Sequence, residues 1–166
     1  MKILITGHKG FIGQNLTFYL QNDHELFGYE WQEEHLPEVD GFDQVIHVGA
    51  ISSTTETDVN KVMLQNYEFT KWLYNQCNTR GVNFQYAWVW QQDHKVCVQG
   101  FRYFNVYGPL EDHKGNQASP VTKFTKEAKD TGKVTLFFGS DNFKRDFVFI
   151  GDVCEAPKQL MENKTP

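Results

Sequence analysis

The sequence predicts an α/β fold built on a doubly wound parallel sheet, and three observations predict it. A short apolar run at residues 2–6 ends in three glycines spaced G-x-x-G-x-x-G, and an amphipathic helical pattern follows. Strand-like and helix-like segments then alternate along the chain, which is typical of a parallel sheet with helices on its faces. The 166 residues suffice for one ordinary domain, and a hydrophobic fraction of 40% is that of a globular protein.

Each element is predicted from the spacing of its apolar residues. Short apolar runs predict buried strands, and apolar residues three or four positions apart predict helices. In chain order we expect a strand at 2–6, a helix at 11–22, strands at 25–31 and 42–50, a helix at 58–80, strands at 82–87 and 95–101, a helix at 120–131, strands at 134–138 and 147–150, and a helix ending at 163. The span between Trp31 and Phe42 is too short for a helix plus a strand, so one peripheral βα unit is expected to be trimmed.

Capping residues mark the ends of three helices. The helix at 58–80 is the clearest, and Gly81 stands in the C′ position that ends it. Ser119 and Pro120 supply the N-cap and first-turn proline of the next helix, which Gly132 closes. Asp152 is expected to cap the last helix. The side chains expected on the buried face of the helix at 58–80 are Val62, Met63, Asn66, Phe69, Leu73 and Cys77.

Composition excludes several classes of protein. No apolar run approaches the length of a membrane span, and the chain reaches a turn at Gly7, too soon for a signal peptide. Cys77, Cys97 and Cys154 are scattered without a CxxC pair, which favours reduced thiols over a disulfide framework or a metal site. We therefore expect a cytoplasmic protein that has no membrane partner and binds no metal.

Charge is unevenly distributed along the chain. Residues 10–60 contain ten acidic residues and no Lys or Arg, whereas residues 61–166 contain fourteen basic and eleven acidic residues, a net charge of +3. A mildly basic half suits an anionic ligand such as a diphosphate. It is too dilute for nucleic acid, which requires a concentrated basic stripe. An unevenly charged solvated surface is an equally good interpretation of these counts.

The glycine loop predicts a dinucleotide site of the Rossmann type. Glycines allow a tight turn and a close approach of the backbone to a pyrophosphate, and the following helix offers unpaired N–H groups. Glu30 ends the next predicted strand, where an acid binds the ribose 2′-OH of NAD. Lys9 within the loop would instead suit the 2′-phosphate of NADP. The cofactor is therefore NADP or NAD, and a capping role for Glu30 and a solvated Lys9 are the alternatives.

Five stretches of sequence resemble the extended short-chain dehydrogenases/reductases that act on nucleotide sugars. They are TGHKGFIG (6–13), HVGAISSTTE (47–56), FRYFNVYGP (101–109), DHKGNQAS (112–119) and FFGSDNFKRDFVFIGDV (137–153). The last two are more selective and resemble the ADP-glyceromanno-heptose 6-epimerases within this NAD-dependent epimerase/dehydratase family. The resemblance covers nearly the whole chain. It implies an isomerase in which bound NADP or NAD oxidises a nucleotide-diphosphate sugar and then re-reduces it on the opposite face.

The resemblance also implies site residues and a homo-oligomer. Lys114 matches an acid/base candidate. Together with Lys9 and Glu30, which are identified from the glycine loop and the strand after it, the resemblance gives the full set of cofactor-binding candidates. They are Gly7, Lys9, Gly10, Phe11, Ile12, Gly13, Glu30, Val48, Gly49, Ala50, Ile51, Ser52, Asn66 and Val106. The substrate-binding candidates are Asn105, Asn116, Lys123, Phe137, Gly139, Ser140 and Arg145.

Several of these candidates have structural alternatives. Asn105 would cap a strand end, Arg145 would pair with Asp146, and Lys114 would be an exposed loop lysine. Two candidates depart from the family pattern, because Asn116 replaces a small hydroxyl residue and Lys123 stands near a position often held by His. These two changes would alter the sugar pocket.

The catalytic Tyr-x-x-x-Lys of the family is not found where the resemblance expects it. The only such pattern, Tyr67 to Lys71, precedes the strand that should carry the catalytic Ser or Thr, so we expect no catalytic role for it. The motif should follow Ala87. The seven residues 88–94 are too few for a parallel crossover, so about 35 to 40 residues of the family pattern are expected to be missing there. A seven-residue antiparallel hairpin is the alternative, and it would break the sheet order.

The expected domain organisation is a Rossmann domain at 1–106 and part of a substrate-binding region at 107–166. This second region would contain a returning strand and helix. The family continues beyond that helix, so we expect a further C-terminal segment. There are two alternatives to a heptose epimerase: another nucleotide-sugar epimerase or dehydratase, such as a UDP-hexose 4-epimerase, and a catalytically inactive dinucleotide-binding module.

Overall fold

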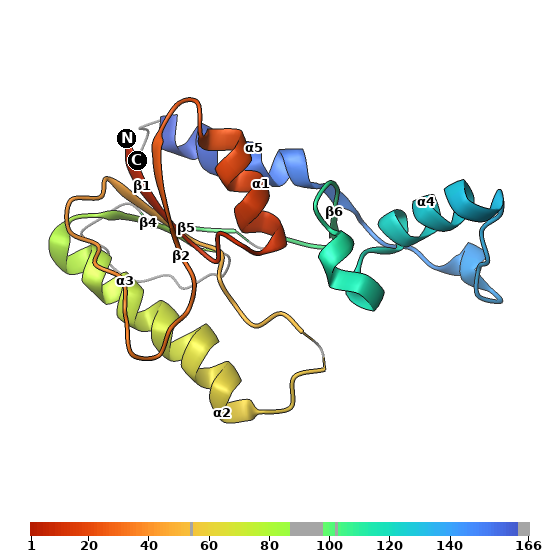
Figure 1. Ribbon diagram of the computed structural model, residues 1–166, viewed down its shortest axis with the longest axis horizontal. Coiled ribbons are helices and arrows are strands. Elements are labelled where there is room, and N and C mark those ends of the chain that lie inside the picture. Colours follow the sequence, from red (N-terminus) through yellow and green to blue (C-terminus); the bar gives the residue numbers. More distant parts are fainter. Residues whose placement is uncertain (54, 87–97, 102, 163–166) are drawn as a thin grey trace.

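A parallel sheet with helices on both faces forms the body of the protein (Figure 1). The computed structural model describes residues 1–53, 55–86, 98–101 and 103–162. The sheet has five parallel strands in the order β2-β1-β3-β4-β5. Its strands are β1 (Lys2–Thr6), β2 (Glu25–Tyr29), β3 (Gln44–His47), β4 (Asn83–Tyr86) and β5 (Val98–Gly100). The predicted α/β fold with a doubly wound parallel sheet is thus confirmed.

Helices and a small second sheet complete the described chain. The helices are α1 (Phe11–Leu20), α2 (Val59–Val62), a π-helical segment (Met63–Glu68), α3 (Phe69–Arg80), α4 (Pro120–Thr131) and α5 (Ile150–Glu162), with 3-10 turns at Asp112–Gln117 and Ser140–Asn142. The second sheet pairs β6 (Val106–Tyr107) with β7 (Val148–Phe149) in parallel. Helices α1 and α5 lie together on one face of the five-stranded sheet, and α3 lies on the other.

Two apolar clusters hold these layers together, one on each face of the sheet. The first joins β1 and β3 to α1 and α5 through side chains such as Ile5, Leu16 and Val153. The second joins β3 and β4 to α3 and contains Leu73 and Phe84, both fully buried. Because β1 and β3 contribute to both clusters, the strands that lead into the candidate site are fixed from both sides.

The predicted helix ends agree with the structure at three positions. Gly81 and Gly132 adopt left-handed conformations directly after α3 and α4, and the Ser119 hydroxyl caps α4 by accepting a bond from the Thr122 amide. The trimmed βα unit is confirmed, since residues 30–43 form no helix or strand. The pairing of β4 with β5 is parallel, which excludes the antiparallel hairpin. Residues 87–97 lie outside the described residues, so the segment expected to be missing after Ala87 stays a prediction.

Three local predictions are wrong. Residues 134–138 form no strand, because no described strand lies beside them to complete a ladder. Helix α5 begins at Ile150, so Asp152 lies within its first turn instead of capping it. Met63 is 48% exposed although it was assigned to the buried face. The π-helical segment explains Met63, because widening the helix rotates this residue away from the face that carries Phe69.

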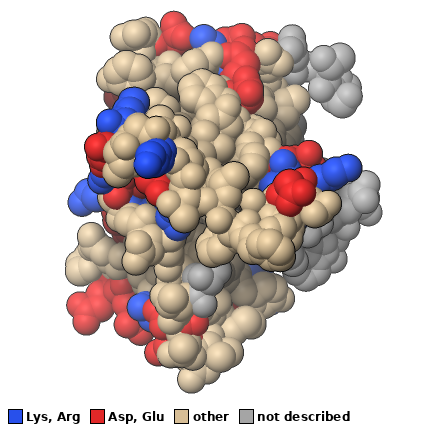
Figure 2. All heavy atoms as spheres, turned by 90° about the vertical axis from the view of Figure 1, so that its right-hand side faces the viewer, with Lys and Arg blue, Asp and Glu red and all other residues tan. Residues whose placement is uncertain are grey.

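Helix α4 and the chain that follows it project away from the body (Figure 1). The residues of this arm, 120–147, are largely exposed, and among its apolar side chains Phe137, Phe138 and Phe143 are exposed. Seen from that end, the middle of the surface is mostly uncharged, with Lys, Arg, Asp and Glu toward its margins (Figure 2).

The described residues contain neither a helix suited to crossing a membrane nor a cluster suited to a metal ion. No helix among them is both long and apolar enough to cross a bilayer. Nor do they place three or more His, Cys, Asp or Glu residues where they could hold a metal. Cys77 and Cys154 are free and buried, and burial raises the pKa of each thiol to about 12. Cys97 lies outside the described residues.

Candidate functional site

The glycine loop between β1 and α1 packs so tightly that two of its glycines leave no room for a side chain. Gly7 has a φ of +71°, and a Cβ there would lie 2.4 Å from the Cα of Gly49. A Cβ on Gly13 would lie 2.1 Å from the carbonyl oxygen of Gly7. Gly10 forms the N-cap of α1 and offers no capping side chain, so the first-turn N–H groups are left for a ligand. The loop therefore has the shape and dipole that suit a diphosphate.

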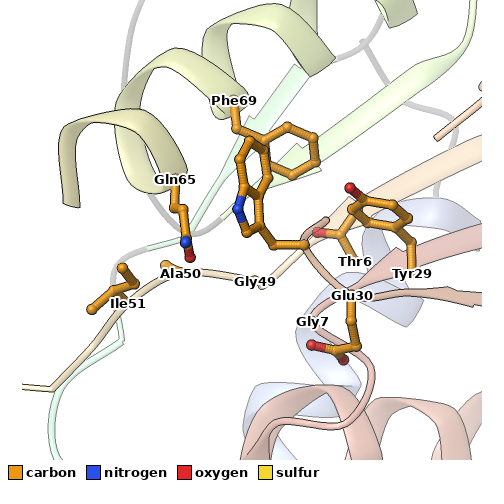
Figure 3. Close-up of a pocket in the computed structure, with 10 residues that line it drawn as sticks. Thr6, Gly7, Tyr29, Glu30, Gly49, Ala50, Ile51, Gln65 and Phe69 are labelled. Atoms are coloured by element: carbon orange, nitrogen blue, oxygen red, sulfur yellow. The ribbon is translucent and has the colours of Figure 1, made fainter. Parts of the chain in front are cut away.

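A pocket opens beside this loop at the carboxyl ends of β1, β2 and β3 (Figure 3). Gly7, Glu30, Gly49, Ala50 and Ile51 were predicted cofactor residues, and all five line it. The other lining residues are Thr6, Tyr29, Trp31, Gln65 and Phe69. Of the remaining cofactor candidates, Gly10 is the N-cap of α1 and Phe11, Ile12 and Gly13 lie in its first turn. Val48 is partly buried against the first apolar cluster, and Ser52 is exposed.

Glu30 joins the end of β2 to the glycine loop. Its Oε1 accepts the backbone N–H of Lys9 at 2.6 Å and lies 3.2 Å from Nδ1 of His8. The His8 ring packs onto Gly28, where a Cβ would lie 2.4 Å from ring atoms. The carboxylate is thus fixed beside the pocket, and the Lys9 side chain is exposed. Glu30 therefore lies at the strand end where the sequence predicts an acid that binds a ribose, and its role in binding one stays a prediction.

Asn66 fastens the loop that follows β3. Its Oδ1 accepts the N–H of Ile51 at 2.7 Å, and its Nδ2 donates to the carbonyl of Ile51 at 2.9 Å. Asn66 lies in the π-helical segment, as does its neighbour Gln65, which points into the pocket (Figure 3). Asn66 therefore supports the pocket wall through the backbone of Ile51.

A buried histidine lies beneath the pocket, and the sequence did not single it out. His47 ends β3, and its ring lies between the hydroxyls of Thr6 and Thr70, at 2.5 and 2.7 Å. Burial lowers the pKa of this imidazole to about 4. The position of His47 between the apolar residues Ile46 and Val48 was the available signal. The aromatic side chains of Trp31 and Phe69, 4.8 Å apart between ring centroids, were also missed as pocket residues because their pattern is that of ordinary core.

Lys114 lies beside the N-terminus of α1. Its Nζ is 4.2 Å from the ring centroid of Phe11 and 3.8 Å from Oε1 of Glu111. Asn15 on α1 donates to the carbonyl of Pro109, which docks this segment on the helix. The Lys114 side chain is 30% exposed, so it is more buried than the alternative of an exposed loop lysine expects. The structure therefore brings the predicted acid/base residue to the predicted diphosphate loop.

Glu111 holds Lys114 and the start of α4 in place. Its buried carboxylate accepts the Ser119 amide at 2.8 Å, the Ser119 hydroxyl at 3.0 Å and the Thr122 hydroxyl at 2.5 Å. Burial raises the pKa of Glu111, but these donors and Lys114 outweigh it and hold the pKa below its ordinary value. The carboxylate is thus the charged anchor of this segment.

Replacing Glu111 by glutamine is expected to lower the free energy of unfolding by about 2 kcal/mol. The glutamine amide group would face one of the three donors that the carboxylate accepts, which leaves buried polar atoms without partners. Urea denaturation measures the change. Asp112→Asn, an exposed change in the same turn, is the matched control and is expected to alter stability by less than about 0.5 kcal/mol. Equal effects of the two variants would contradict the anchoring role.

The predicted substrate-binding residues lie outside the pocket, mostly on the arm. The Lys123 ammonium donates to the carbonyl of Asn116, which brings these two candidates together. Asn105 precedes β6 and donates to the carbonyl of Asp146 at 2.8 Å, as a residue fastening a strand end would. Arg145 is exposed and donates to the carbonyl of Lys144. Of the others, Phe137 is exposed, Gly139 and Ser140 form the turn that follows it, and Val106, the last cofactor candidate, pairs with Val148.

The Tyr67 to Lys71 pattern lies along the helix next to the pocket but does not line it. The Tyr67 side chain is 40% exposed, and the Lys71 ammonium lies 5.7 Å from its ring centroid. Both residues contact each other on the helix surface. The expectation that this pair has no catalytic role stays a prediction.

Comparison with known proteins identifies the sequence family and the fold. The model of the NAD dependent epimerase/dehydratase family matches residues 83–166, which is just over half of the chain. The solved structure of an ADP-L-glycero-D-manno-heptose-6-epimerase from Helicobacter pylori is similar, with a TM-score of 0.78 and 24% identity over 98% of this chain and 74% of that one.

Two further solved structures share this fold. A UDP-N-acetylglucosamine 4-epimerase from Methanobrevibacter ruminantium M1, in complex with UDP-N-acetylmuramic acid, matches with a TM-score of 0.76 and 17% identity over 99% of this chain and 74% of that one. A mutant UDP-glucuronic acid 4-epimerase from Bacillus cereus, in complex with a fluorinated UDP-sugar and NAD, matches with a TM-score of 0.71 and 18% identity over the same shares. At these identities the likeness shows the fold alone.

Proposed function

Because the chain belongs to the NAD dependent epimerase/dehydratase family, we propose that it binds NAD in the pocket beside the glycine loop and epimerises a nucleotide-diphosphate sugar. One observation carries the proposal: Gly7 and Gly13 leave no space for a Cβ, directly before the open N-terminus of α1. This geometry fits a diphosphate, since backbone amides must approach it closely. The fold shared with an NAD complex supports the same assignment.

The proposed cofactor is NAD rather than NADP. The Glu30 carboxylate is held beside the pocket by the Lys9 amide, at the end of the second strand. A carboxylate there accepts hydrogen bonds from the ribose hydroxyls of NAD and repels the 2′-phosphate of NADP. The backbone N–H of Lys9 is already bonded to Glu30 and so is not free to bind the 2′-phosphate of NADP, which strengthens the preference for NAD.

The proposed substrate is ADP-glyceromanno-heptose, epimerised at C6. The stretches DHKGNQAS and FFGSDNFKRDFV support this choice, as does the similarity to the Helicobacter pylori heptose epimerase. NAD, when bound, supplies the hydride acceptor and donor for oxidising and re-reducing the sugar carbon. Lys114 Nζ would give or take the hydroxyl proton on one face of the sugar. Glu111 and Phe11 hold that ammonium beside the diphosphate loop, which orients it for the transfer.

Incubation of the protein with ADP-glyceromanno-heptose and NAD in D₂O tests the substrate. Nuclear magnetic resonance should show inversion at C6 without deuterium at that carbon, because the hydride that leaves also returns. A panel of UDP-sugars run in parallel separates the alternatives. If only a UDP-sugar is turned over, the substrate is a UDP-sugar and not the ADP-heptose, as in the 4-epimerases of the same fold.

A second candidate function is a dinucleotide-binding module without catalysis. The sequence contains a single Tyr-x-x-x-Lys pattern, Tyr67 to Lys71, and these two side chains contact each other on the surface of a helix. The lack of a Tyr-x-x-x-Lys pair elsewhere in the sequence favours this second function. NAD binding measured by calorimetry, with no turnover of any sugar in the panel, would support this module and exclude the epimerase.

Changing Glu30 to glutamine is expected to weaken NAD binding about tenfold, because a charge-assisted bond to the ribose becomes a neutral one. NADP binding should not weaken, since the repulsion of its phosphate is removed. Calorimetric titration of both cofactors measures the change in preference. Glu33→Gln, an exposed acid three residues further along, is the matched control and should leave both affinities unchanged. An unaltered NAD-to-NADP ratio in Glu30→Gln would overturn the assignment of Glu30.

A further inference from the structure

A continuous line of hydrogen bonds runs beneath the pocket from β1 to the loop after β3. It begins at the Thr6 hydroxyl, passes through both ring nitrogens of His47 to the Thr70 hydroxyl, and continues to the carbonyl of Asn66 at 2.7 Å. The Asn66 side chain then holds both backbone groups of Ile51. Thr6 and Ile51 line the pocket at opposite ends of this line.

The direction of each bond follows from counting protons. A carbonyl only accepts, so the single hydroxyl proton of Thr70 goes to Asn66. Thr70 must then accept from His47, which requires a proton on Nε2. A neutral imidazole carries only one N–H, so Nδ1 accepts and the Thr6 hydroxyl donates to it.

The surroundings of the ring require that it be neutral. His47 is only 5% exposed, and the ring of Phe69 lies against it at 5.5 Å between centroids, with Phe84 stacked at 6.1 Å. These neighbours are apolar, and the two hydrogen-bond partners are hydroxyls. An imidazolium in this place would lose its hydration without gaining a carboxylate.

We propose that His47, as the neutral Nε2–H tautomer, is a positioning residue that holds the loops after β1 and β3 in the arrangement the dinucleotide pocket needs. The ring joins three elements that the chain brings together from distant positions: the end of β1, the end of β3 and the start of α3. Thr70 bonds the carbonyl of Asn66, and the Asn66 side chain bonds the backbone of Ile51, so these residues extend the restraint to the loop after β3. The importance of this constraint for binding rests on the proposed function, whereas the tautomer and the loop restraint do not.

The tautomer and the loop restraint are tested without any cofactor. Long-range proton–nitrogen correlation spectra of the protein labelled at histidine should show His47 as a single Nε2–H tautomer near neutral pH, with the signal assigned through its loss in His47→Gln. In Thr70→Val, the Nε2–H loses its acceptor, and hydrogen exchange of the Ile51 amide should accelerate about tenfold.

Thr131→Val is the matched control for Thr70→Val. The Thr131 hydroxyl also bonds a carbonyl four residues earlier, that of Glu127 at 2.8 Å, but on α4. This control should leave Ile51 exchange and the His47 tautomer unchanged. An Nδ1–H tautomer, a charged ring, or unchanged Ile51 exchange in Thr70→Val would overturn the proposal.

Cofactor titration then links the restraint to binding. Thr70→Val should raise the dissociation constant for NAD about five- to tenfold, and His47→Leu should raise it further. His47→Gln keeps one donor and one acceptor and should recover part of the affinity that His47→Leu loses. Equal affinities of the Gln and Leu variants would refute the hydrogen-bonding role. If the unaltered protein bound no dinucleotide while the tautomer and exchange results held, the proposed function would fail and the positioning role would stand.

Discussion

Replacing Gly13 by alanine is expected to lower the free energy of unfolding by about 3 kcal/mol and to weaken NAD binding at least about 100-fold. The added Cβ would lie 2.1 Å from the carbonyl oxygen of Gly7 and 2.6 Å from the Cα of His8, and both atoms belong to the backbone. Either α1 or the glycine loop must therefore shift. A shift of either one moves the amides that would contact a diphosphate, so stability and binding fall together. Thermal unfolding and calorimetry measure the two effects.

Gly81→Ala separates the two effects of the Gly13 substitution. Gly81 has a φ of +73° but open space around it, so alanine there is strained without a collision and should cost about 1 kcal/mol. Because Gly81 ends α3 far from the glycine loop in the chain, NAD binding should be unchanged. Normal NAD affinity in Gly13→Ala would show that this loop does not bind the cofactor.

His47 is expected to make the protein sensitive to mild acid. Burial lowers the pKa of its imidazole from 6.5 to about 4, so the folded protein keeps the ring neutral while the unfolded chain protonates it. Its contribution to stability is therefore complete above pH 6.5 and is lost as the pH falls through 4. Over this window the free energy of unfolding should decrease by about 3 kcal/mol.

Urea denaturation at a series of pH values measures this loss. Since carboxylates also titrate near the acidic end of the window, the comparison with His47→Gln isolates the histidine. Glutamine has no proton to gain, so the stability of that variant should vary less between pH 6.5 and 4. Parallel pH profiles for the two proteins would mean that His47 does not titrate as its burial requires.

Much of the fold could be predicted because it depends on local patterns. The glycine loop, the left-handed Gly81 after α3 and the Ser119 cap each follow from residue types whose backbone preferences are strong. The absence of a strand at 134–138 could not be predicted, since an apolar run does not reveal whether a neighbouring strand exists to pair with it. The π-helical turn at 63–68 was also missed, because nothing in the residue pattern distinguishes it from an α-helix.

The candidate site was predictable only for residues whose place follows from their position at the end of a strand. Glu30 and Ile51 follow strands, so their places at the sheet edge were evident from the sequence. The bonds of His47 to Thr6 and Thr70 join residues 41 and 23 positions away, and the sequence pattern carries no sign of them. Contact between Lys114 and Phe11 likewise depends on how the segment after β6 docks on α1.

The missing βα unit between Trp31 and Phe42 leaves β2 as the edge strand of the sheet. One side of its backbone is therefore available for strand addition by another chain, a hazard that proteins reduce with charges and short edges. Here β2 has only five residues, and Glu25 at its start is exposed. Glu30 just beyond its end bears a second charge. The short length of β2 and the exposed charge of Glu25 therefore limit strand addition at this edge, while the Glu30 carboxylate stays bonded to the Lys9 amide on the pocket side.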